Sequence, residues 1–152
     1  YLVLSHHERR AQYDAELEQA RQREAAKEER KRQIAERNFT EAMAVAERGD
    51  ERKATEYLRA AISLNPYRAS YYVRLAEFLA QDHRWQWESM RYFNRAIQLE
   101  PHNPRHYVAV GDLFQILVQP ELARRAYRQA LKRDPTYGPA LHGMSALRRS
   151  GG

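Results

Sequence analysis

A proline recurs every 34 or 35 residues between positions 66 and 135 of this chain, and the residues in front of it recur as well. The three prolines are Pro66, Pro101 and Pro135. A small residue, a large apolar residue and an alanine precede each of them at fixed distances: Ala54, Leu58 and Ala61; Ser89, Phe93 and Ala96; Ala123, Tyr127 and Ala130. A period of this length indicates a repeat protein in which each unit packs on its neighbours.

Each unit also contains an earlier segment with helical spacing, read as Tyr72, Leu75, Ala76 and Leu79 in the second and as Tyr107, Val110, Gly111 and Phe114 in the third. The two segments together resemble the tetratricopeptide repeat (TPR) pattern W-x2-L-G-x2-Y…A-x3-F…A…P, most closely over residues 104–135. Small residues let two helices approach closely, and the proline ends the second helix. The second unit has one extra residue, which we place around Arg84–Gln86.

The resemblance implies an all-α fold, an α-solenoid of three TPR helical hairpins at residues 35–68, 69–103 and 104–137. Residues 138–149 then form a capping helix, because a solenoid needs a polar outer face at its end. Alanine, arginine, glutamate, leucine and glutamine dominate the composition, and all five are strong or moderate helix formers. Residues 35–149 are therefore expected to be one repeat domain.

The first residues, YLVLSHHERRAQYD, are similar to the end of a J domain of the DnaJ family, AYxVLSDPxKRxxYD, with His6 and His7 in place of Asp and Pro. We interpret residues 1–17 as the C-terminal remnant of a J domain in a longer parent protein, because the sequence begins at Tyr1 and not at methionine. The alternative is an ordinary helix, since Ser5 and Glu8 form a capping box. The HPD motif through which J domains stimulate a DnaK-type chaperone is absent from the sequence.

Residues 18–34 are interpreted as a charged helical linker. No glycine or proline occurs from His6 to Arg48, and glutamates lie three or four residues before lysines or arginines, a spacing that stabilises helix surfaces. Apolar residues are too few for a sustained coiled-coil seam. We expect one long charged N-terminal helix, with self-association along Tyr13 and Leu17 as an open alternative.

No catalytic site, cofactor or metal site is expected. The chain has no cysteine and no phosphate-binding or hydrolase motif, and His102 and His106 are interpreted as exposed turn histidines. No apolar run approaches the roughly 20 residues that span a bilayer, so no membrane partner is expected. A chain without cysteine fits a reducing compartment, and the expected location is the cytoplasm.

The TPR resemblance implies that the first helix of each hairpin lines a concave groove. The repeat phase then predicts one apolar row, one mixed row and two flanking arginines as groove residues: Phe39, Val73 and Val108; Met43, Glu77 and Asp112; Arg74 and Arg105. We expect a protein or peptide ligand with apolar anchors and some basic groups. The carboxylate clamp of chaperone-binding TPR domains is not expected, because of its five positions only Arg105 keeps a suitable charge.

Most of the net charge of +6 comes from residues 119–149, in particular from a basic patch formed by Arg124, Arg125, Arg128 and Lys132. The leading function is a protein-interaction scaffold in a parent that resembles a J-domain co-chaperone and thereby has a DnaK-type chaperone as partner. One alternative is binding of nucleic acid or another acidic surface through the basic patch, although aromatic residues do not alternate with these positions as base stacking requires. The other is an architectural helical oligomer.

Overall fold

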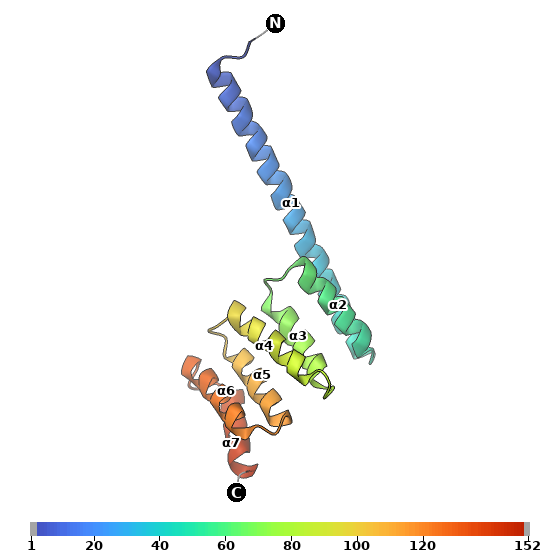
Figure 1. The fold of residues 1–152 in the computed structure, drawn as a ribbon, viewed down its shortest axis with the longest axis vertical. Helices are drawn as coiled ribbons and strands as arrows, with labels where there is room; N and C mark the ends of the chain where they lie inside the picture. Colours follow the sequence, from blue (N-terminus) through green and yellow to red (C-terminus); the bar gives the residue numbers. More distant parts are fainter. Residues whose placement is uncertain (1–2, 151–152) are drawn as a thin grey trace.

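The computed structural model describes residues 3–150, and these form seven helices without a strand (Figure 1). The helices are α1 (His6–Glu47), α2 (Glu51–Leu64), α3 (Ala69–Ala80), α4 (Gln86–Leu99), α5 (Pro104–Ile116), α6 (Pro120–Arg133) and α7 (Gly138–Ser150). α1 pairs with α2, α3 with α4 and α5 with α6, while α7 packs on α5 and α6. The predicted all-α solenoid is confirmed.

The repeated residues occupy equivalent places in the three hairpins. All nine of the small, large and alanine positions before the prolines are at most 2% exposed. The carbonyl of the alanine nearest each proline (Ala61, Ala96, Ala130) accepts the N–H of the residue just past its helix, at 2.9–3.0 Å. The hydroxyls of Tyr72 and Tyr107 both donate to the carbonyl of the preceding proline, at 2.9 Å. The spacing of the prolines thus gives the correct repeat phase.

The N-terminal arm, residues 6–34 of α1, projects away from the repeats and is exposed along almost its whole length (Figure 1). Its first turn contains the predicted capping box, in which Glu8 N–H donates to Ser5 Oγ at 3.2 Å and Ser5 N–H donates to Glu8 Oε2 at 2.7 Å. These bonds lower the pKa of Glu8. The capping box explains locally why the helix begins here, and the J-domain resemblance stays a prediction.

Ion pairs within α1 support the arm in place of tertiary packing. Lys31 lies 2.7 Å from Glu28, and Arg32 lies 3.5 Å from Glu29. Such exposed pairs stabilise a helix only weakly, because water screens them. Ala35 is the first buried residue of α1, so packing against the rest of the protein begins there.

The turns inside the three hairpins follow one edge of the solenoid, at the lower right in Figure 1. The α1–α2 and α5–α6 turns have three residues each, 48–50 and 117–119, whereas the α3–α4 turn has five, 81–85. The extra residue of the second repeat therefore lies in the predicted turn. In this turn Arg84 binds Asp82 at 2.6 Å and lowers the pKa of that carboxyl to about 2.

Candidate functional site

An elongated groove of about 550 Å³ opens between the first helices of the hairpins. Its lining residues come from α1, α3, α5 and the two turns between the repeats: Phe39, Arg68, Ser70, Val73, Arg74, Glu77, Glu100, Asn103, Arg105, His106 and Ala109. A smaller hollow of about 160 Å³ continues along α3 and α5 and shares Glu77 and Ala109 with the groove. The groove thus combines residues from three successive repeats.

The apolar part of the groove consists of Phe39 and Val73, which are both half-buried. The ring of Phe39 lies 5.1 Å from that of Tyr71, measured between centroids. Tyr71 is fully buried and donates from its hydroxyl to Glu36 Oε2 at 2.9 Å. Burial and the neighbouring carboxylate raise the pKa of Tyr71 to about 12, so this bond persists at neutral pH. Phe39 is therefore held in a fixed place while part of its ring stays accessible.

Most charged side chains of the groove are already paired within the protein. Arg74 lies 2.9 Å from Glu77, and Arg68 lies 3.1 Å from Glu36. In the described structure, by contrast, the guanidinium of Arg105 has neither an ion pair nor a hydrogen bond, although its backbone N–H donates to Asn103 Oδ1 at 3.1 Å. Arg105 is thus the cation of the groove that remains available to a ligand.

His106 forms part of the groove wall at the start of α5. It is 5% exposed, so its interpretation as an exposed turn histidine is wrong. Its Nε2 lies 2.7 Å from Glu100 Oε2, and Asn103 Nδ2 donates to the same oxygen at 2.9 Å. The bonds from Asn103 and His106 lower the pKa of Glu100. The three residues fix the turn that presents Arg105.

The structure places five predicted groove residues on the groove: Phe39, Val73, Arg74, Glu77 and Arg105. Met43 does not line it, and its side chain packs against the core cluster that α1, α2 and α3 form. Asp112 lines the smaller hollow and accepts a hydrogen bond from the Tyr127 hydroxyl at 2.6 Å. The residues from the inter-repeat turns, Arg68, Glu100, Asn103 and His106, were not predicted, since helix periodicity says nothing about turns.

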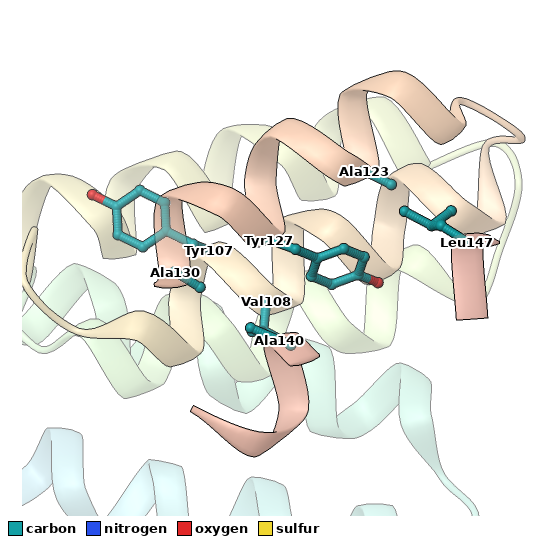
Figure 2. Close-up of a cluster of buried hydrophobic side chains, with 7 residues drawn as sticks. All are labelled: Tyr107, Val108, Ala123, Tyr127, Ala130, Ala140 and Leu147. Atoms are coloured by element: carbon teal, nitrogen blue, oxygen red, sulfur yellow. The ribbon is translucent and has the colours of Figure 1, made fainter. Parts of the chain in front are cut away.

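Val108 was expected to be open to the groove, and this expectation is wrong. It is 8% exposed and lies in a cluster with Tyr127, Ala140 and Leu147, shown in Figure 2. The cap α7 packs over this part of α5 and covers the position that corresponds to Val73 in the preceding repeat. In the last repeat, this apolar position of the first helix is therefore part of the core.

The predicted basic patch lies on α6, the second helix of its hairpin. Arg124 of this patch has a side chain that is 25% exposed and lies 3.6 Å from Glu121. The other three members are Arg125, Arg128 and Lys132, which are exposed and form no ion pair with residues 3–150. The one aromatic residue of α6, Tyr127, is fully buried, so no ring is available on this helix for base stacking.

Within residues 3–150, no group of His, Asp or Glu is arranged to hold a metal ion. None of the helices in this range combines the length and the apolar character that crossing a membrane requires.

No protein-family model and no curated protein sequence matches the chain. Solved structures do match its fold. The TPR domain of Arabidopsis OM64 superposes with a TM-score of 0.70 at 22% identity, over 79% of this chain and 98% of that one. The first TPR domain of Spaghetti (RPAP3), bound to the HSP90 peptide SRMEEVD, gives 0.70 at 16% identity, over 78% and 94%.

The Yersinia enterocolitica type III secretion chaperone SycD, in complex with a peptide of the translocator YopD, gives a TM-score of 0.67 at 11% identity, over 77% of this chain and 94% of that one. The chain therefore has the fold of TPR domains. At these identities the likeness concerns the fold alone.

Proposed function

We propose that this chain is a protein-interaction scaffold whose groove binds a short segment of a partner protein. The observation that carries the proposal is the groove itself, where half-exposed Phe39 and Val73 lie beside the unpaired Arg105. A fixed apolar surface next to a free charge can bind one apolar side chain and orient its neighbours. Two of the similar structures, RPAP3 and SycD, have peptides bound, which supports the same class of function here.

The chemistry of the ligand follows from the pairing of the groove charges. We expected basic groups in the ligand because of Glu77 and Asp112, but these carboxylates already bind Arg74 and Tyr127. The available charge is that of Arg105. We therefore propose a ligand with an apolar anchor on Phe39 and Val73 and an acidic group opposite Arg105.

Selection of peptides from a displayed random library on the immobilised chain tests this function. Selected peptides should combine an apolar residue with a nearby acidic one. Phe39→Ala should weaken the binding of a selected peptide at least about fivefold, since an aromatic anchor typically contributes more than about 1 kcal/mol. Phe39→Leu, which keeps an apolar surface, should weaken it less.

Two measurements keep this test specific. Circular dichroism should show unchanged helix content in Phe39→Ala, because the ring is only half-buried and alanine is a good helix former. Arg128→Glu, on the exposed face of α6, should bind like the natural chain. If Arg128→Glu abolishes binding and Phe39→Ala does not, the ligand occupies the basic patch and the groove proposal is wrong.

We also propose that residues 1–17 are the end of a J domain, in a cytoplasmic co-chaperone-like parent that recruits partners to a DnaK-type chaperone. The support is the sequence resemblance alone. Because the HPD motif is absent, the chain should not stimulate ATP hydrolysis by such a chaperone in single-turnover measurements. If this chain at saturating concentration stimulates ATP hydrolysis, the stimulating activity does not need an upstream part of the parent, and its assignment to that part is wrong.

A further inference from the structure

Within the repeats, large apolar side chains are exposed mainly at one edge of the solenoid. Seven such side chains are exposed within residues 35–149, and five of them lie in or next to the α3–α4 and α5–α6 turns: Trp85, Trp87, Ile116, Val118 and Leu122. Trp87 is 66% exposed and Val118 is 81% exposed. The two turns are neighbours on the edge seen in Figure 1, and we call these five residues the apolar edge. The α1–α2 turn (48–50) contributes none of the seven.

Val118 has a left-handed backbone conformation that valine rarely adopts. Its φ is 56°, and the equivalent residue of the first hairpin is Gly49 with φ 85°. Both residues end their helix with the same type of closing bond, Asp50 N–H to Val45 O at 3.1 Å and Gln119 N–H to Phe114 O at 2.8 Å. Glycine adopts this conformation without strain, whereas a β-branched residue does so rarely. Val118 makes little contact with the protein in return, which indicates that its exposed side chain has another use.

The available charges around the apolar edge are positive. Its carboxylates are paired, Asp82 with Arg84, Glu88 with Arg59 and Glu121 with Arg124. Four arginines close to these residues have no ion pair with the described residues. Arg91 follows Trp87 on α4, and Arg125 follows Leu122 on α6, each by one helical turn. Arg148 and Arg149 directly follow Leu147, which lies close to Val118. A hollow of about 530 Å³ beside Val118 is lined by Gln119, whose amide can donate a hydrogen bond to a phosphate, and by the ion pair of Arg124 with Glu121.

We propose that the apolar edge is a peripheral docking surface for an anionic lipid membrane. Tryptophan and branched apolar side chains at the tips of turns can enter the headgroup region, while surrounding arginines bind anionic lipids. The tips protrude, so they need no complementary cavity in a partner protein. The expectation of no membrane partner rested on the lack of a spanning segment, and peripheral contact does not need one. The proposal is independent of the peptide groove.

The two tryptophans of the chain provide a direct test, because both belong to the apolar edge. Vesicles of phosphatidylcholine with phosphatidylserine should shift tryptophan emission to shorter wavelength and carry the chain through flotation. Vesicles of phosphatidylcholine alone should do neither at the same lipid concentration. Emission that anionic vesicles leave unchanged at low salt, or an equal shift with both kinds of vesicle, overturns the proposal.

Val118→Gly separates a role in binding from a role in the fold. It relieves the strained conformation, so its melting temperature should rise by a few degrees, while its flotation with anionic vesicles should fall several-fold. Tyr67→Ala removes a side chain that is 77% exposed on the opposite edge and should float like the natural chain. Equal flotation of Val118→Gly and the natural chain, or an equal loss with Tyr67→Ala, contradicts the proposed surface.

Discussion

A Gly111→Val chain should lose about 3 kcal/mol of stability, which corresponds to a decrease of roughly 10 °C in melting temperature for a protein of this size. A Cβ atom at position 111 would lie 2.5 Å from Cε1 of Tyr127. The Tyr127 ring has no room to move away. Gly143 of α7 also lies against this ring, and the Tyr127 hydroxyl binds Asp112 and Gln115. Thermal unfolding followed by circular dichroism measures the loss.

Gly138→Val is the matched control. A Cβ atom there meets nothing within 4 Å, so its melting temperature should change by no more than a few degrees. Tyr127→Leu removes the far end of the ring, and the double variant with Gly111→Val should be more stable than the sum of the two single losses implies. Strictly additive losses would show that Gly111 and Tyr127 do not interact as the structure places them.

The fold was predictable because each repeat position has a strict physical requirement. Ala61, Ala96 and Ala130 allow two helices to approach, and any larger residue would separate them. The requirement recurs with the repeat, so three imperfect copies define one phase. The same argument could not reveal the N-terminal arm as anything beyond a charged helix, because exposed residues such as Arg23 or Lys27 make few contacts that restrict their identity.

The groove was less predictable, because repeats that are equivalent in sequence differ in their neighbours. Val73 and Val108 have the same repeat position, yet α5 leaves the first half-exposed and α7 buries the second. His106 was interpreted as an exposed turn histidine, whereas it is buried and lies 2.7 Å from Glu100 in the preceding turn. Periodicity locates the face of a helix, but the next element in space decides whether that face is open.

Val108→Asp and Ala109→Asp should therefore differ strongly in their effect on stability, although the two positions are adjacent. The Val108→Asp substitution would place an unpaired carboxylate in the cluster of Tyr127, Ala140 and Leu147, and a buried charge without a partner typically costs about 3–5 kcal/mol. Ala109 is only half-buried and lines the groove, so its replacement should cost less than about 1 kcal/mol. Urea unfolding of the two variants measures this difference.

Peptide affinity should rank the same two variants in the reverse order, with the larger loss of affinity in Ala109→Asp. A carboxylate at position 109 would lie in the groove near Arg105, where it would compete with the acidic group of the ligand. Folded Ala109→Asp should therefore bind a library-selected peptide at least tenfold more weakly than the natural chain. Val108→Asp should be measured without urea, where part of the protein stays folded. Its binding capacity should be lower, while the dissociation constant of the folded part should be unchanged. If Val108→Asp is as stable as the natural chain and lowers the affinity, Val108 lies open to the groove, and the packing of α7 over α5 is not that of the protein in solution.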